Sequence, residues 1–250
     1  MSLKIISIVG ARPQFIKYAA LTEEISKNFQ DVLIHTGQHY DDSMSSIFFN
    51  ELKIHNPDYN LEVGSGTHGF QTGEMLKKIE PILIKEKPDF VLVYGDTNST
   101  LAGALAAIKL NIPVAHIEAG LREFDKTIPE EINKIVVDHI STILFPPSKT
   151  GVKNLKNEGI NKNVHFIGDI TLDLAKKIAS NKVSNIECLK KFNLTAKNYY
   201  FFTMHRQKNT EDARRLKNIL NFLEEFNEKT IIFPIHPRTM KTIIQHNYFE

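Results

Sequence analysis

The stretch from Pro88 to Lys109 most constrains the fold of this chain, because its apolar residues change their spacing partway along it. Residues 90–94 are continuously apolar, which predicts a strand that is buried on both faces. Gly95 then turns the chain, and Ala and Leu recur at helical spacing, so a helix follows the strand. A buried strand joined to a crossover helix is typical of an α/β fold with a parallel sheet.

Acidic residues follow two neighbouring apolar runs. Asp96 comes directly after the first strand, and a second apolar run, residues 112–118, ends in Glu118. Open parallel sheets bind their ligands at the carboxyl ends of the strands, so these two acids predict a site. Glu130 lies one loop further on, at the start of a helix, and is a third candidate. We interpret Glu131 as a residue whose negative charge only stabilises the N-terminus of that helix.

Two basic residues near the start of the chain are candidates for binding an anion. Arg12 and Lys17 flank the first turn of a predicted helix, where exposed backbone amides already favour negative charge. Basic residues there run against the helix dipole, which suggests that they hold an anionic ligand. The alternative is a pair of solvated surface charges. Gln38 and His39 also follow a strand, but such a pair more often makes hydrogen bonds within its loop.

The remaining elements continue the alternation of strands and helices. We expect further strands at residues 3–9, 32–36, 143–145, 164–168, 199–204 and 230–234, and helices at 13–29, 43–52, 70–86, 130–140, 169–180 and 210–228, with one more helix ending near Gly159. The polar stretch 181–197 is predicted to be a connector with a short helix. We therefore expect a first Rossmann-like domain over residues 1–180, and over 181–250 the connector and the start of a second domain.

The second domain is expected to be incomplete. Two strands and two helices leave sheet edges and faces uncovered. This part of the chain is therefore expected either to depend for its stability on packing against the first domain or to continue beyond Glu250 in the natural protein. We favour the continuation.

Composition excludes several function classes. The formal net charge is +2 with the lysines spread over helices, which gives no reason to expect a nucleic-acid partner. Cys188 is the single cysteine, so neither an internal disulfide nor a cysteine metal cluster is expected, and a cytosolic enzyme is the natural prediction. The apolar start, residues 1–10, is too short for a signal peptide or a membrane span. Residues 64–69 match G-x-G-x-x-G, but their context does not fit a dinucleotide site.

With these positions in view, the chain resembles the non-hydrolysing UDP-N-acetylglucosamine 2-epimerases from Gly10 to its end. The resemblance depends on the order and spacing of short motifs: Gly10-Ala-Arg-Pro-Gln-Phe-Ile-Lys17, Thr36-Gly-Gln-His39, Gly95-Asp-Thr-Asn-Ser-Thr100, His116-Ile-Glu-Ala-Gly-Leu-Arg122, Pro129-Glu-Glu-Ile-Asn133, His205-Arg206 and His236-Pro-Arg238. It implies two Rossmann-like lobes of the glycosyltransferase-B type with the active site between them. It also implies a homodimer that supplies precursors for cell-surface polysaccharides.

The resemblance further implies an isomerase that interconverts UDP-N-acetylglucosamine and UDP-N-acetylmannosamine, by elimination of UDP and re-addition to a 2-acetamidoglucal. It assigns catalysis to Asp96, Glu118, Glu130 and His205, and binding of the UDP-sugar to Arg12, Lys17 and Arg206. It implies no metal and no redox cofactor. In several bacterial relatives, residues matching Gln38, His39 and His236 help form a regulatory site. Asp41 stands where regulated relatives tend to have Gln, which argues against that regulation here.

Other functions stay open at this stage. A glycosyltransferase of the same architecture would bind the same kind of substrate, although three carboxylates argue against it. An epimerase acting on a diacetamido or otherwise modified UDP-sugar fits the same motifs. A non-catalytic lobe that senses sugar nucleotides would fit a short chain. Family members run past residue 250 and carry a Gly-Gly-x-x-Glu-Glu segment that grips the uridine there, so we expect weak nucleotide binding and turnover by residues 1–250 alone.

Overall fold

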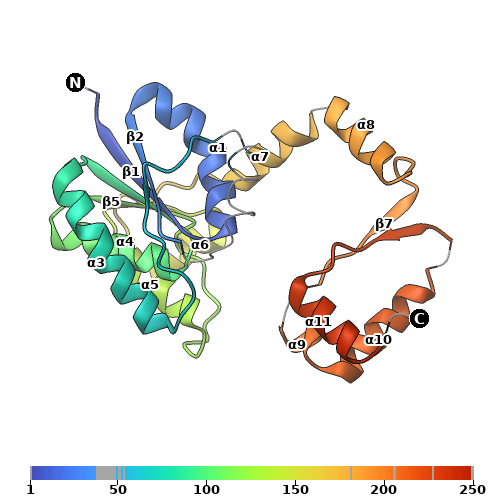
Figure 1. The fold of residues 1–250 in the computed structure, drawn as a ribbon. Helices are drawn as coiled ribbons and strands as arrows, with labels where there is room; N and C mark the ends of the chain where they lie inside the picture. Colours follow the sequence, from blue (N-terminus) through green and yellow to red (C-terminus); the bar gives the residue numbers. More distant parts are fainter. Residues whose placement is uncertain are drawn as a thin grey trace. The chain divides into compact units, whose positions relative to one another are not determined.

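The computed structural model describes residues 2–37, 49, 52, 54–180, 182–204, 207–226 and 228–248 (Figure 1). The chain divides into two compact units, Met1–Ile178 and Ala179–Glu250. The helix expected at 43–52, apart from Phe49 and Leu52, lies outside the described residues. So do Gln38, His39, His205 and Arg206. Among the helices that the structure describes, none is both long enough and apolar enough to cross a bilayer.

The first unit is a parallel sheet with helices in its connections. Its strands are β1 (Lys4–Val9), β2 (Gln30–His35), β3 (Tyr59–Asn60), β4 (Phe90–Tyr94), β5 (Val114–Ile117) and β6 (Ile143–Phe145). Its helices are α1 (Arg12–Asn28), α3 (His68–Glu86), α4 (Asn98–Lys109), α5 (Pro129–Ile140), α6 (Lys149–Asn157) and α7 (Ile170–Ala179). The strand order β3-β2-β1-β4-β5-β6 is that of a Rossmann-type doubly wound sheet, in which the strand order reverses between β1 and β4.

Alternate residues of the strands enter two separate cores, one on each face of the sheet. On β4, Val91 and Val93 pack into the core made with α3, α4 and α5, whereas Leu92 and Tyr94 pack into the core made with α1 and the start of α7. Successive side chains of a strand point to opposite faces, so a strand covered on both faces must be apolar throughout. Figure 1 shows α3, α4 and α5 together on one side of the sheet.

The second unit is smaller. It contains α8 (Lys182–Lys191), β7 (Tyr199–Phe201), α9 (Gln207–Thr210), α10 (Ala213–Glu224), β8 (Thr230–Ile232) and α11 (Pro237–Gln245). The strands β7 and β8 pair in parallel. Met204, Leu216 and Ile243 form the centre of its core.

One predicted element is wrong in the structure, and another has shorter bounds than expected. The strand expected at 164–168 is a single bridge between Val164 and Leu144, after which the chain leaves β6 and turns at Gly168, whose φ is +81°. The helix expected at 210–228 is α10, Ala213–Glu224, which begins three residues later than expected because the Asp212 side chain accepts the N–H of Arg215 at 3.0 Å and caps the helix there. A residue that caps a helix takes a non-helical backbone conformation, which interrupts the pattern.

Gly120, in the loop after β5, is a glycine whose replacement should strongly destabilise the first unit. Its φ is +78°, and a Cβ there would lie 2.4 Å from the carbonyl oxygen of Gly151. Gly120→Ala is therefore expected to lower the free energy of unfolding by about 3 kcal/mol, from left-handed strain together with overpacking. Gly159→Ala is the matched control: its φ is +83° but its Cβ would meet nothing within 4 Å, so about 1 kcal/mol is expected. Urea denaturation checks both, and equal losses would contradict the packing argument.

Candidate active site

The register of the sheet places two acids side by side. Tyr94, the last residue of β4, pairs with Ile117, the last residue of β5, so Asp96 and Glu118 leave neighbouring strands at nearly the same level. Glu118 itself has a φ of +77°, which is strained for a residue with a side chain. Gly95 has little room, because a Cβ there would lie 3.2 Å from Oε2 of Glu118. The turn after β4 therefore lies directly beneath the Glu118 carboxylate.

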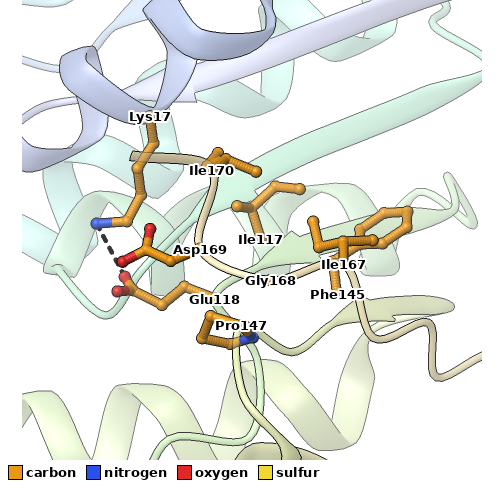
Figure 2. Close-up of a pocket in the computed structure, with 9 residues that line it drawn as sticks. All are labelled: Lys17, Ile117, Glu118, Phe145, Pro147, Ile167, Gly168, Asp169 and Ile170. Carbon is orange, nitrogen blue, oxygen red and sulfur yellow. Dashed lines mark ion pairs between the residues drawn. The ribbon is translucent and has the colours of Figure 1, made fainter. Parts of the chain in front are cut away.

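A lysine from the first helix meets this carboxylate. The Nζ of Lys17 lies 2.9 Å from Oε2 of Glu118, and the Lys17 side chain is only 10% exposed. The two residues line a small open pocket, with Asp169 pointing toward them in Figure 2. The rest of the lining comes from Ile117, Phe145, Pro147, Ile167, Gly168 and Ile170. The pocket thus joins a cation and two acids from three separate segments.

Asp169 was missed as a site residue from the sequence, where it served only to start a helix. Its carboxylate accepts the backbone N–H and the hydroxyl of Thr171 at 2.9 and 2.7 Å. These hydrogen bonds lower the pKa of Asp169, and the charge of Lys17 lowers it further. A signal was present in the sequence, because Gly168-Asp169 repeats the Gly-Asp pair that follows β4.

Asp96 lies among charges of both signs. Burial is the main cause that raises its pKa, and the negative charges of Glu118 and Glu130 raise it further. Lys134 and Lys17 act in the opposite direction. The Nζ of Lys134 lies 3.7 Å from Oδ2 of Asp96. Glu118 and Glu130 are therefore close enough to Asp96 to raise its pKa, as carboxylates do in sites for proton transfer.

Lys134 is a second residue that sequence reasoning missed, because it occupies an ordinary helical position in α5. Its side chain is 7% exposed, and its Nζ also lies 3.4 Å from Glu123 and 3.6 Å from Glu131. The Lys134 side chain is therefore surrounded by carboxylates, and one of these carboxylates, Asp96, is the candidate base.

Removing this charge should change the pH dependence of the reaction. Since Lys134 lowers the pKa of Asp96, Lys134→Met should raise that pKa, and less Asp96 is then ionised at low pH. The acidic limb of the plot of kcat against pH is therefore expected to shift to higher pH by about 1 unit. Lys134→Arg keeps the charge and should leave the limb in place. If the acidic limb of Lys134→Met lies at the same pH as that of the wild type, Lys134 does not act on the titrating acid.

The buried side-chain amides of Gln14 and Asn133 fix the loops around these acids. The Gln14 side chain accepts the N–H groups of Gly10 and Ala11 at 2.7 and 3.0 Å and donates to the carbonyl of Tyr94 at 2.8 Å. Asn133 donates to the backbone carbonyl of Asp96 at 2.8 Å. The backbone N–H groups of Gly10 and Ala11 are therefore already paired with Gln14.

Glu131 has a structural role, in agreement with its interpretation from the sequence. It is 1% exposed, and its carboxylate accepts the N–H groups of Glu123 and Phe124 at 2.9 and 3.0 Å. It therefore closes the loop that precedes α5.

The structure brings four of the predicted site residues together: Asp96, Glu118, Glu130 and Lys17. Arg12 is the first residue of α1 and is exposed. His236 is an exposed residue of the second unit, just before α11. The expected roles of Gln38, His39, His205 and Arg206 stay predictions, because these residues lie outside those that the structure describes.

A Rossmann-type sheet whose neighbouring strands end in interacting carboxylates defines a class: α/β enzymes that move protons on a ligand bound at the strand ends. Within this class, the chain belongs to the UDP-N-acetylglucosamine 2-epimerase family, whose sequence model matches residues 22–249. The predicted family and the isomerase class of its members are thereby confirmed.

Three relatives illustrate the likeness. A UDP-N-acetylglucosamine 2-epimerase homolog of Methanococcus maripaludis is 57% identical over 249 residues, which cover 99% of this chain and 70% of the relative. A UDP-2,3-diacetamido-2,3-dideoxy-D-glucuronate 2-epimerase of Pseudomonas aeruginosa is 46% identical over 96% of this chain and 69% of its own length. The crystal structure of the UDP-GlcNAc 2-epimerase of Methanocaldococcus jannaschii with UDP-GlcNAc and UDP matches 99% of this chain and 69% of its own, at 47% identity and a TM-score of 0.81. The expected α/β, glycosyltransferase-B-like fold class is thus confirmed.

Proposed function

We propose that the protein interconverts UDP-N-acetylglucosamine and UDP-N-acetylmannosamine without hydrolysing them. Membership of the family and the relative crystallised with UDP-GlcNAc and UDP support this substrate. The observation that carries the proposal is the set of three acids, in which the charges of Glu118 and Glu130 raise the pKa of Asp96, a buried group, beside the cation of Lys17.

The chemistry requires acids on both faces of the sugar ring. The hydrogen on C2 is barely acidic, so its removal is coupled to the departure of UDP from C1. A carboxylate takes the proton from C2, the C1–O bond breaks with its electron pair on UDP, and a 2-acetamidoglucal forms. UDP then returns to C1 while a second acid gives a proton to the other face of C2. Asp96, Glu118 and Glu130 would supply these groups, with His205 as a further catalytic residue.

Cations would stabilise the departing diphosphate. Negative charge builds up on UDP in the transition state, and a preorganised cation in a partly buried site stabilises it. Lys17 is already held beside Glu118, and Arg12 lies on the same helix. We assign these two residues and Arg206 to the UDP-sugar.

Incubation of the full-length gene product with UDP-GlcNAc in D₂O tests the proposal. NMR of the sugar should show deuterium replacing the C2 hydrogen while UDP-ManNAc appears. Transfer of the sugar to an acceptor without exchange would indicate a glycosyltransferase instead. Binding without either reaction would indicate a sensor of sugar nucleotides.

A diacetamido sugar nucleotide is a second candidate substrate, favoured by the 46% identity to the Pseudomonas aeruginosa enzyme. The same exchange assay, run with the UDP-linked diacetamido uronic acid, decides between the two by the ratio of kcat/KM. The acid set is the same in both reactions, because both invert C2.

Assembly, location and regulation are extensions of this proposal. We assign a homodimer and a cytosolic location to the protein, the latter because its substrate would be a nucleotide sugar and its sequence has a single cysteine. Light scattering of the full-length gene product checks the dimer. Gln38, His39 and His236 are the residues to substitute if the rate depends on UDP-GlcNAc in a sigmoidal manner.

A further inference from the structure

A network of four ionisable side chains lies beneath the candidate site, three of them buried and the fourth, Glu158, 27% exposed, and the mechanism above does not use it. His116 on β5 is completely buried, and so is the side chain of Asp138 on α5. Arg122 is 1% exposed and pairs with both Asp138 and Glu158 at 2.7 Å. Charges this deeply buried are costly unless they are paired, so the network calls for a reason.

Both ring nitrogens of His116 face acceptors. Nε2 lies 2.7 Å from the carbonyl oxygen of Gly95, and Nδ1 lies 2.7 Å from Oδ1 of Asp138. A carbonyl oxygen can only accept a hydrogen bond, so Nε2 carries a proton. Oδ2 of Asp138 accepts the N–H of Gly120 at 2.9 Å and also contacts the guanidinium of Arg122.

Asp138 is ionised in this environment. Burial alone would raise its pKa, but the pKa is lowered, and two of the causes do not depend on the ring: the charge of Arg122 and the hydrogen bond from the Gly120 N–H, both of which reach Oδ2. An ionised carboxylate accepts only, so Nδ1 of His116 donates as well, and the ring is an imidazolium. This state also balances the network, because Asp138 and Glu158 carry two negative charges and Arg122 with the ring carries two positive ones.

The network connects the three segments that carry the candidate acids. Gly95 immediately precedes Asp96, and Gly120 follows Glu118 by two residues. Asp138 is part of α5, the helix whose first turn contains Glu130. The chain of contacts from the Gly95 carbonyl through His116 and Asp138 to the Gly120 N–H therefore fixes both turns against the helix. It also holds the backbone of Glu118 in its left-handed conformation.

We infer that His116, as an imidazolium, and Asp138 are positioning residues that set the separation of the catalytic acids. They touch no substrate and act through the backbone turns of Asp96 and Glu118. This role depends on the proposed epimerase function, because it requires that these acids transfer the protons. Misplacement of a catalytic group by about 1 Å can cost about 10²-fold in rate.

Nitrogen NMR of the full-length gene product, labelled with ¹⁵N-histidine, tests the charge of the ring without any turnover. The His116 signals are assigned by their loss in His116→Gln, and both ring nitrogens should carry protons at pH 7. In Asp138→Asn, the amide can donate to Nδ1, so the proton on Nδ1 should be lost while that on Nε2 stays. A ring in the wild type with one protonated nitrogen would overturn the inference.

The exchange assay tests the positioning. Gln at residue 116 can donate to the Gly95 carbonyl, but it cannot donate to Asp138 at the same time. His116→Gln should therefore lower kcat about 10²-fold and change KM less than threefold. His139→Gln is the control. The His139 ring lies 3.3 Å from Glu158 at the edge of the network, and its side chain is 45% exposed. The kcat of this variant should equal that of the wild type.

Two results of the assay would overturn the positioning role. One is a kcat of His116→Gln within threefold of the wild type. The other is a loss of kcat that only matches the loss of folded protein measured by circular dichroism. If the wild type itself fails to exchange the C2 hydrogen, the proposed function fails, whereas the NMR result still decides the state of the ring.

Discussion

Asp96→Asn and Glu118→Gln are each expected to lower the exchange of the C2 hydrogen of UDP-GlcNAc by about 10³-fold while the protein stays folded. Each change keeps the size of the side chain and removes its ability to take a proton. Neither residue is needed for packing, since the side chains of Asp96 and Glu118 are 38% and 27% exposed. Deuterium incorporation followed by NMR, with circular dichroism as the check of folding, measures both.

Glu131→Gln is the matched control for these variants. It lies on the same helix as Glu130, but its carboxylate closes a loop by accepting two backbone N–H groups. Its replacement leaves the buried Lys134 with one charge fewer, so we expect a loss of stability of about 1–3 kcal/mol and little loss of exchange per folded molecule. Near-normal exchange in both Asp96→Asn and Glu118→Gln would show that other groups transfer the protons.

The core of the fold could be predicted because buried parallel strands are uninterrupted apolar runs. The run at Phe90–Tyr94 coincides with β4, and that at Ile143–Phe145 coincides with β6. The edge strand β3 could not be found, because Tyr59–Asn60 is only two residues long and depends on pairing with β2. The start of α10 was predicted three residues too early, at Thr210 instead of Ala213, because the capping hydrogen bond between Asp212 and Arg215 cannot be recognised from the spacing of apolar residues.

The site could be predicted in part for a similar reason. Acids that directly follow strands, Asp96 and Glu118, are recognisable because the sheet itself determines where strand ends meet. Lys134, His116 and Asp138 could not be recognised as partners, because each sits inside an ordinary helix or strand pattern. Their roles come from contacts across the fold, such as that of His116 with the Gly95 carbonyl, which no spacing along the chain encodes.

Lys17 is the residue whose loss should most weaken contact with the diphosphate. It lies five residues beyond Arg12 on α1, and its Nζ is held 2.9 Å from Oε2 of Glu118, so the proposed diphosphate ligand and a candidate acid share one cation. Lys17→Met should lower kcat/KM by about 10²- to 10³-fold, the usual cost of removing one preorganised group that stabilises the transition state. Calorimetry should also show weaker binding of UDP.

The control for this prediction is Lys27→Met, on the same helix. Lys27 is 57% exposed and pairs only with Glu23 and Glu24 among the contacts described, so its loss should change neither rate nor UDP binding. The comparison also separates two roles of Lys17. If Lys17 only held Glu118 in place, Lys17→Met would lose rate but bind UDP normally; if it also grips the diphosphate, both fall together. Unchanged kcat/KM in Lys17→Met would remove Lys17 from the site altogether.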